Sequence, residues 1–319
     1  MNNSQLKIVF MGTPEFAVPT LKILLENHYT ISAVVTVPDK PAGRGQKITY
    51  SAVKQFAIDN NIKVLQPEKL RDPDFITELK NIEPDLQIVV AFRMLPEIVW
   101  QLPKIGTFNL HGSLLPQYRG AAPINWAIIN GENKTGVTTF FIEKEIDTGK
   151  IIFSDEIAIK PDDTAQTLHD KMQLVGANLV LKTVRAIESN NYTQISQSVF
   201  IAENQILKPA PKIFKDDCLI NWNLNSENIY NFIRGLSPYP AAYTYLNKLQ
   251  LKIFEVSIEK TKHIFEPGTF LSDGKKTLKV AVNDGFINIL LLQLEGKKRL
   301  LADEFLRGFK LTDQIILIS

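Results

Sequence analysis

The sequence is poor in cysteine and contains no long apolar run. Its one cysteine, Cys218, excludes an internal disulfide, so a reducing compartment is the expected location. No apolar stretch approaches the roughly 18 residues of a membrane span. The N-terminus shows neither the basic and apolar regions of a secretory signal nor an arginine-rich presequence. We therefore expect a cytoplasmic protein that does not enter a membrane.

Several sequence motifs of catalysis and ligand binding are also absent. The four histidines are scattered, with no H-E-x-x-H and no cysteine pair, so no metal site is expected. There is no G-x-S-x-G nucleophile elbow. The first predicted strand-to-helix turn, at residues 12–15, holds a single glycine, where the G-x-G-x-x-G fingerprint of dinucleotide binding needs three. A zinc enzyme, an α/β-hydrolase and an NAD-binding enzyme are all disfavoured.

The composition is that of a globular protein of more than one domain. Of 319 residues, 45% are hydrophobic and 22% are charged, which is ordinary for a folded chain. That length exceeds the usual size of a single domain. The formal net charge of +2 neither requires nor excludes a nucleic-acid partner, because the distribution of charge matters more than its total.

The first 188 residues alternate short apolar or β-branched runs with amphipathic segments. This pattern is typical of α/β proteins with a Rossmann-like, mostly parallel sheet. The predicted strands are residues 7–11, 31–36, 63–65, 86–91, 107–110, 135–141 and 151–159. The predicted helices are residues 17–26, 51–60 with Ser51 as N-cap, 72–80 begun by Asp72 and Pro73, 123–130 and 164–188.

After residue 188 the pattern changes. Residues 189–205 are polar and lack helical periodicity, which is typical of an interdomain linker. A helix is predicted over 226–236, capped by Ser226. Short apolar runs then follow, separated by Gly, Asn and Asp, at 243–246, 251–256, 268–271, 278–282 and 286–294. They predict a small C-terminal barrel or sandwich. The expected domains are 1–188, a linker over 189–205, and 206–319.

Basic charge is concentrated in the C-terminal part. Residues 205–319 contain 16 Lys/Arg and 12 Asp/Glu, a net charge of +4, whereas the whole chain carries +2. The sign of this excess favours contact with a polyanion.

A second basic segment follows the strand predicted at 31–36. Residues 37–47 contain two prolines and two glycines, with Lys40, Arg44 and Lys47 against one carboxylate, Asp39. This composition predicts an extended surface loop. The Gly-Lys-Ser/Thr ending of a P-loop is missing. The segment is either a solvated connection or, as its length suggests, a functional loop.

Two polar side chains end the strand predicted at 107–110. Asn109 and His111 are two residues apart and therefore point the same way along a strand. Such strand ends carry the chemistry of open α/β sheets. Asp147, between two later predicted strands, is placed to return to the same edge. An amide and an imidazolium stabilise an oxyanion, and a carboxylate keeps the histidine charged or accepts a proton. Singly, each residue also has an ordinary structural role. Ser113 as a nucleophile beside His111 is disfavoured, because a strand-end turn does not guarantee contact between them.

These segments carry a family resemblance. Asn109 followed by His111-Gly112-Ser113-Leu114-Leu115-Pro116, and then Asp147-Thr148-Gly149, resembles the formyltransferases that use 10-formyltetrahydrofolate. The resemblance extends over essentially the whole chain. It includes Gly12-Thr13-Pro14-Glu15-Phe16-Ala17, Pro38-Asp39-Lys40-Pro41-Ala42-Gly43-Arg44-Gly45, Tyr118-Arg119-Gly120-Ala121-Ala122-Pro123 and Ile220-Asn221-Trp222. The chain is most similar to the members that formylate methionyl-initiator tRNA.

The resemblance implies a reaction and a set of residues. The methionine α-amine of the charged initiator tRNA attacks the formyl carbon carried on the folate N10. Asn109 and His111 stabilise the oxyanion, and Asp147 orients His111 and assists proton transfer. The implied folate-binding residues are Phe92, Arg93, Met94, Leu95, Ser113, Leu114, Leu115 and Pro116. The implied tRNA-binding residues are Lys40, Arg44 and Lys47, together with an OB-like C-terminal β-barrel. No metal is implied, and a monomer is expected.

One segment departs from the family pattern. Residues 92–94 are Phe-Arg-Met, where many members have a small, glycine-containing turn. Glycinamide ribonucleotide formyltransferases have a comparable segment there.

Three other activities are compatible with parts of the pattern. A formyltransferase acting on an amino sugar nucleotide would share Asn109, His111 and Asp147. A hydrolase or dehydrogenase module acting on 10-formyltetrahydrofolate is disfavoured, because no aldehyde-dehydrogenase extension follows. A catalytically silent tRNA- or folate-binding module is disfavoured by the presence of all three residues.

Overall fold

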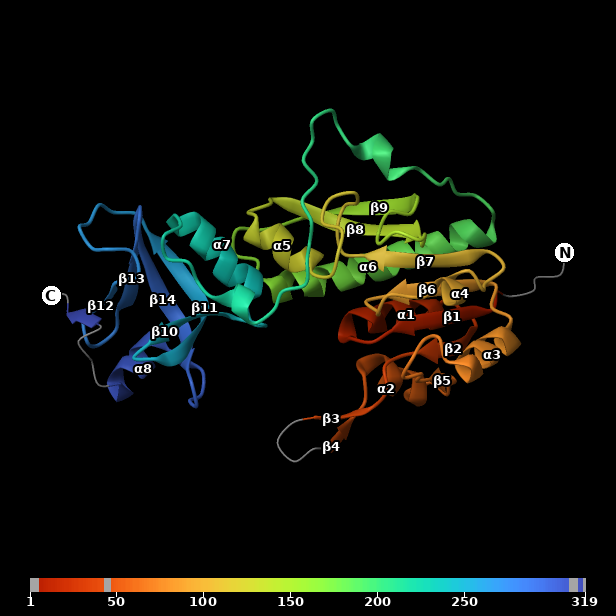
Figure 1. The fold of residues 1–319 in the computed structure, drawn as a ribbon, viewed down its shortest axis with the longest axis horizontal. Helices are drawn as coiled ribbons and strands as arrows, with labels where there is room; N and C mark the ends of the chain where they lie inside the picture. Colours follow the sequence, from red (N-terminus) through yellow and green to blue (C-terminus); the bar gives the residue numbers. More distant parts are fainter. Residues whose placement is uncertain (1–5, 43–46, 310–314, 318–319) are drawn as a thin grey trace. The chain divides into compact units, whose positions relative to one another are not determined.

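The chain forms two compact units in the computed structural model, which describes residues 6–42, 47–309 and 315–317 (Figure 1). The first unit comprises the described part of residues 1–120 together with 136–157 and 169–209. The second comprises 121–135, 158–168 and the described part of 210–319. Residues 189–205, which the sequence predicts as an interdomain linker, lie within the first unit.

The first unit is built on a sheet of seven strands. In sheet order they are β5 (Val64–Leu65), β2 (Ile31–Val35), β1 (Ile8–Gly12), β6 (Leu86–Val90), β7 (Gly106–His111), β8 (Lys134–Phe141) and β9 (Ile151–Ala158). The first five are parallel, and β8 runs antiparallel to β7. The predicted Rossmann-like, mostly parallel sheet is confirmed.

The helices near these strands are η1 (Glu15–Ala17), α1 (Val18–Glu26), α2 (Ala52–Asp59), α3 (Pro73–Ile82), α4 (Glu97–Trp100), α5 (Pro123–Ile129) and α6 (Ala165–Glu188). The five helices predicted near these strands are present and begin within one residue of the predicted starts, whereas the short helices η1 and α4 were not predicted. Ser51 caps α2 by accepting from the Lys54 amide at 3.1 Å. Asp72 caps α3 by accepting from the amides of Asp74 and Phe75. Both caps satisfy amides that have no partner inside the helix.

The parallel strands are buried on both faces, as their continuous apolar sequence requires. One face packs against α3 through Val9, Met11, Ala33, Val35, Val89, Phe75, Ile76 and Leu79. On the other face α6 approaches closely, since a Cβ added at Gly176 would lie 2.7 Å from the Leu110 side chain. Because Leu110 points to the α6 face, its neighbours Asn109 and His111 point to the opposite face.

The second unit contains the predicted β domain. Its sheet order is β10 (Ala242–Leu246), β11 (Leu249–Glu259), β14 (Gly285–Leu294), β13 (Leu278–Val282), β12 (Phe270–Ser272) and β16 (Ile315–Leu317), with β15 (Leu300–Leu301) also paired to β14. The pairs from β10 to β12 are antiparallel. The other elements are η3 (Asp216–Cys218), α7 (Ser226–Leu236) and α8 (Ala302–Gly308). The OB-like prediction is confirmed as an antiparallel half-barrel.

One predicted cap is wrong. Helix α7 begins at Ser226, but its N-cap is Asn225, whose side chain accepts from the Asn228 amide at 2.8 Å. Ser226 is fully buried and donates its amide and hydroxyl to the two carboxylate oxygens of Asp284. Two adjacent residues were both good capping types, and a contact 58 residues away decided between them.

The basic loop at 37–47 contains regular structure at its ends. Strands β3 (Lys40–Ala42) and β4 (Lys47–Thr49) pair antiparallel as a two-stranded ribbon that is separate from the main sheet. Pro41 is compatible with this position because the ribbon has only edge strands. Among the described helices, none is both long and apolar enough to cross a membrane.

Candidate active site

The site lies at the carboxyl ends of β6 and β7. The strand order places β1 between β2 and β6, so the connections leave β1 in opposite directions. Ligands of open α/β sheets bind beside such a switch point. Asn109 lies in register with Val89 of β6 and with Phe140 of β8, while His111 pairs with Thr138 of β8. The predicted strand end is therefore flanked by β6 and β8.

One ring nitrogen of His111 makes a hydrogen bond to the backbone. The side chain is buried, and Nε2 lies 2.8 Å from the Tyr118 carbonyl oxygen. A carbonyl only accepts, so Nε2 carries a proton. Nδ1 faces the other way, 3.8 Å from Oδ2 of Asp147. A doubly protonated ring would therefore donate to Tyr118 from one nitrogen and face a carboxylate with the other.

Asp147 stands in the turn between β8 and β9 with a backbone φ of +56°. This left-handed conformation is uncommon outside glycine, although Asp and Asn adopt it more readily than other residues. Its carboxylate accepts from the Gly120 amide at 2.9 Å and is 12% exposed. The structure thus brings His111 and Asp147 together from elements that are 36 residues apart in the printed sequence.

Asn109 has an unused hydrogen-bonding atom. Its Oδ1 is buried and has no partner within the described residues. A buried acceptor without a partner costs free energy comparable to a lost hydrogen bond. Such an atom next to His111 is a suitable contact for a bound donor, for example an amine.

Ser113 does not pair with His111. It is fully buried and its hydroxyl donates to the Gln117 carbonyl at 2.6 Å, while its own carbonyl accepts from Thr138 at 2.7 Å. These contacts fix the turn that carries Leu114, Leu115 and Pro116, the rest of the predicted folate segment. Leu115 and Pro116 are buried and Leu114 is half-buried.

The Arg93 side chain turns away from the strand end. Its guanidinium donates to the carbonyls of Pro67 and Glu68, and burial lowers its pKa. Arg93, Met94 and Leu95 border a pocket of about 390 Å³ that Lys144 also lines. Leu95 is buried in the core, whereas Met94 is 76% exposed. Within the predicted segment 92–95, the Arg93 side chain anchors the loop at 67–68.

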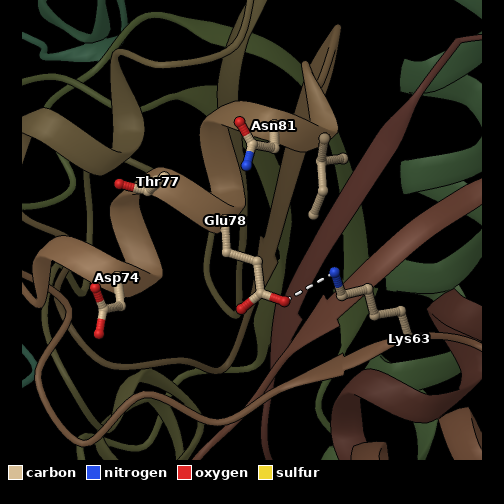
Figure 2. Close-up of a pocket in the computed structure, with 6 residues that line it drawn as sticks. Lys63, Asp74, Thr77, Glu78 and Asn81 are labelled. Carbon is tan, nitrogen blue, oxygen red and sulfur yellow. Dashed lines mark ion pairs between the residues drawn. The ribbon is translucent and has the colours of Figure 1, made fainter.

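A different pocket is lined by α3 and by Lys63, the residue just before β5 (Figure 2). Its lining includes Asp74, Thr77 and Asn81, and an ion pair joins Lys63 to Glu78 at 2.8 Å. None of the predicted site residues lines it. It therefore has no part in the arrangement around His111.

The predicted tRNA-binding residues are only partly described. Lys40 is exposed on β3. Lys47 lies on β4, but its side chain is outside the described part, and Arg44 lies outside the described residues altogether.

The base of this ribbon is fixed by Asp39. Its carboxylate lies 2.5 Å from the Lys54 ammonium and accepts from the Gln66 amide at 2.8 Å. Gln66 also donates to the Val37 carbonyl at 2.8 Å. The hydrogen bonds from Lys54 and then Gln66 hold the pKa of Asp39 below its ordinary value. The ribbon is thereby tied to α2 and to the segment after β5.

We expect Asp39→Asn to lower the melting temperature at pH 7, because it leaves the Lys54 ammonium without its carboxylate. A carboxyl group with a lowered folded-state pKa contributes stability above its unfolded pKa of about 3.9 and loses it as pH falls through the lower folded value. The difference between wild type and variant should therefore shrink below about pH 4. Thermal unfolding from pH 7 to 3 measures this, with the exposed Asp59→Asn in α2 as control. Equal melting temperatures at pH 7 would contradict it.

Comparison with known proteins identifies the family. Residues 6–184 match the formyl transferase family and residues 212–310 match the formyl transferase C-terminal domain. The chain is 54% identical over 318 residues to the methionyl-tRNA formyltransferase of Bacteroides thetaiotaomicron, covering 98% of each chain. The chain belongs to the methionyl-tRNA formyltransferase family.

Solved formyltransferase structures share the fold. WlaRD, a sugar 3N-formyl transferase crystallised with dTDP and 5-N-formyl-THF, has a TM-score of 0.65 and 25% identity, covering 93% of this chain and 100% of that one. The Helicobacter canadensis N-formyltransferase, crystallised with folinic acid and dTDP-3-aminofucose, has a TM-score of 0.63 and 26% identity, covering 89% and 98%.

Sequence reasoning missed several residues that hold the candidate site together. Tyr118 and Gly120 contact His111 and Asp147 through their backbone, which no side-chain pattern reveals. Gln197, within the segment predicted as a linker, donates to the carbonyls of Asp147 and Gly149. Its polar surroundings in the sequence gave no signal that it would be buried.

Proposed function

We propose that the chain transfers the formyl group of 10-formyltetrahydrofolate to the α-amino group of methionyl-initiator tRNA, giving N-formylmethionyl-tRNA for translation initiation. The family membership supports the reaction class. The observation that carries the assignment to this site is the approach of Asp147 to His111 at the end of β7, where Asn109 lies on the same face and its Oδ1 has no partner among the described residues.

The three residues divide the work as follows. As the amine adds to the formyl carbon, negative charge develops on the formyl oxygen. The Asn109 amide N–H and the His111 Nδ1–H donate to that oxygen, while Asn109 Oδ1 accepts from the attacking amine. Asp147 stabilises the imidazolium. It also accepts the proton that the attacking amine loses and passes this proton to the leaving nitrogen, N10 of the folate. The contact between Nε2 and Tyr118 keeps the ring oriented throughout.

For the formyl donor, we propose a site between residues 92–95 and 113–116. Backbone groups of these segments would contact the pteridine, since the Arg93 guanidinium and the Ser113 hydroxyl already have protein partners. Leu114, Leu115 and Pro116 would supply apolar contact. Two related structures were crystallised with 5-N-formyl-THF and with folinic acid, which supports a folate as the formyl donor.

Two observations support tRNA as the formyl acceptor: the sequence identity to relatives and the distribution of basic residues. A relative at 54% identity is a methionyl-tRNA formyltransferase, whereas the sugar N-formyltransferases are 25% and 26% identical. The net charge of +4 over residues 205–319 and the basic residues Lys40, Arg44 and Lys47 suit a phosphate backbone. We propose residues 1–188 as the catalytic region and 206–319 as a tRNA-binding region of a cytoplasmic monomer.

The deciding experiment mixes the protein with 10-formyltetrahydrofolate and charged initiator tRNA, and it offers charged elongator tRNA and UDP-amino sugars as competing acceptors. Formyl-methionine should appear on the initiator tRNA alone. Formylation of the sugar in preference to the tRNA would transfer the assignment to the sugar class. Folate turnover without an acceptor product would point to a hydrolase.

Arg44→Ala is expected to raise the KM for initiator tRNA about tenfold and to reduce the steepness with which binding falls with salt, because one phosphate contact is lost. The KM for 10-formyltetrahydrofolate should stay within about twofold of wild type, because the substitution removes a contact to the tRNA backbone and none to the folate. Steady-state kinetics at several salt concentrations measure both quantities, with Lys22→Ala, an exposed lysine of α1, as control. Unchanged tRNA kinetics would make the loop a mere connection.

A further inference from the structure

The turn that carries Asp147 is held from one side by a single buried side chain. Gln197 begins the short helix η2 (Gln197–Phe200) and is only 3% exposed. Its Nε2 donates to the Asp147 carbonyl at 2.8 Å and to the Gly149 carbonyl at 2.9 Å. One of these carbonyls belongs to Asp147 and the other lies two residues after it, so both contacts hold the segment that follows the left-handed backbone of Asp147. Such a conformation persists only where the surroundings hold it.

The other end of the same amide is fixed by Arg119. Oε1 of Gln197 accepts from Nε of Arg119 at 3.0 Å and from a terminal guanidinium nitrogen at 2.7 Å. Both N–H bonds and both lone pairs of the Gln197 amide are therefore used. No alternative orientation of the amide satisfies these four partners, because a flipped group would turn its N–H bonds toward the guanidinium.

These contacts close a ring around Asp147. Arg119 is followed directly by Gly120, whose amide donates to the Asp147 carboxylate at 2.9 Å. The Asp147 carboxylate is thus held by Gly120, and the Asp147 carbonyl is held by Gln197, which Arg119 fixes in turn. The turn is closely packed at Gly149, because a Cβ added there would lie 1.7 Å from the Phe141 carbonyl oxygen.

The segment that supplies Gln197 is itself attached to the first unit. Ile195 exchanges two backbone hydrogen bonds with Ile151 of β9, each 2.9 Å long. Ser196 caps η2 by accepting from the Ser198 amide. Farther along, the Lys208 carbonyl accepts from the Tyr118 amide at 2.7 Å. Tyr118 is the residue whose own carbonyl binds His111.

We infer that Gln197, itself fixed by Arg119, is a positioning residue for formyl transfer that sets the Asp147 carboxylate against Nδ1 of His111. It does not touch the reacting atoms. The inference rests on the proposed function for its kinetic test, and on the geometry alone for its spectroscopic one.

Gln197→Glu separates the two ends of the contact. A glutamate still accepts from Arg119 but presents an oxygen to the carbonyls of Asp147 and Gly149, so the two hydrogen bonds to the Asp147 turn are lost while the contact with Arg119 is kept. The expected kcat is about 10- to 100-fold lower, because a small displacement of a catalytic group has effects of that size. The KM values for both substrates should remain close to wild type. Val199→Ala, a neighbour that is 72% exposed, is the matched control.

A double-mutant cycle distinguishes positioning from general stability. If Gln197 acts through Asp147, adding Gln197→Glu to Asp147→Asn should change kcat by less than about twofold, because residues that act as a unit are not additive. A full additional loss in the double variant would overturn the inference. If Gln197→Glu does not fold, Arg119→Lys, which replaces the double contact by a single donor, should give a smaller loss that is also absent in the Asp147→Asn background.

The ring signals of His111 test the geometry without any substrate. The chain has four histidines, so the His111 signals in a ¹H–¹⁵N spectrum are assigned by comparison with His111→Ala. Gln197→Glu should shift them in the same direction as Asp147→Asn, and Val199→Ala should not. Unchanged signals would overturn the inference. Should the wild-type chain fail to formylate initiator tRNA, these spectra still decide the role of Gln197.

Discussion

The Asp147→Asn enzyme is expected to lose at least about 100-fold in kcat, the lower range for a group that assists proton transfer. Asparagine has nearly the same shape and still offers an oxygen to the Gly120 amide, which lies 2.9 Å from the carboxylate. What it lacks is negative charge opposite Nδ1 of His111, 3.8 Å away. The imidazolium then loses its counter-charge, and the amine proton loses its acceptor.

Single-turnover formyl transfer to initiator tRNA measures this loss apart from product release. Glu145→Gln is the matched control, because it removes an exposed carboxylate from the same turn. The melting temperature of Asp147→Asn should stay close to that of wild type. Full activity in Asp147→Asn, or an equal loss in Glu145→Gln, would remove Asp147 from the proposed mechanism.

His111→Ala is expected to lower kcat by about 100-fold or more, the usual cost of removing one donor to a developing oxyanion. The KM for the folate should change little, since the contact strengthens as charge develops on the formyl oxygen. His169→Ala serves as control for the loss of an imidazole, because His169 lies on α6 and its ring contacts Phe16 in a tilted arrangement, with centroids 5.2 Å apart.

We expect His111→Ala to lower the melting temperature only moderately and to keep the fold. The substitution removes one side chain and one hydrogen bond, to the Tyr118 carbonyl, and leaves the strand backbone in place. Circular dichroism and thermal unfolding of His111→Ala check that the fold is retained. A variant that transfers formyl groups at the wild-type rate would make His111 a structural residue. Aggregation without activity calls for the milder His111→Gln in its place.

Much of this architecture follows from local sequence patterns. Continuous apolar runs predict the parallel strands, and Ser51 and Asp72 predict two helix starts, because each depends on residues within one turn. The pairing of Asn109 with His111 also follows from strand periodicity alone. The contact between His111 and Asp147 is less local. The position of Asp147 between two predicted strands indicated only that this residue could return to the same edge of the sheet.

The contacts that sequence could not predict are long-range and involve ordinary polar residues. Gln197 lies 50 residues from the carbonyl it binds, in a stretch whose composition is that of a linker. The position of the Asn225 cap depended on Asp284. The Arg93 guanidinium has partners in the loop at 67–68, although the family resemblance implied a contact with the folate. In each case tertiary contacts, and not local propensity, decided the outcome.

The attachment of residues 195–208 to the first unit has a consequence for biosynthesis. Asn109, His111 and Asp147 all leave the ribosome before Gln197 and Lys208, whose contacts complete the turns around them. A nascent chain released at residue 188 would possess the sheet and all three chemical groups, yet its catalytic turns would lack their outer support. On the proposed function, we therefore expect full competence for formyl transfer only after residue 208 has left the ribosome.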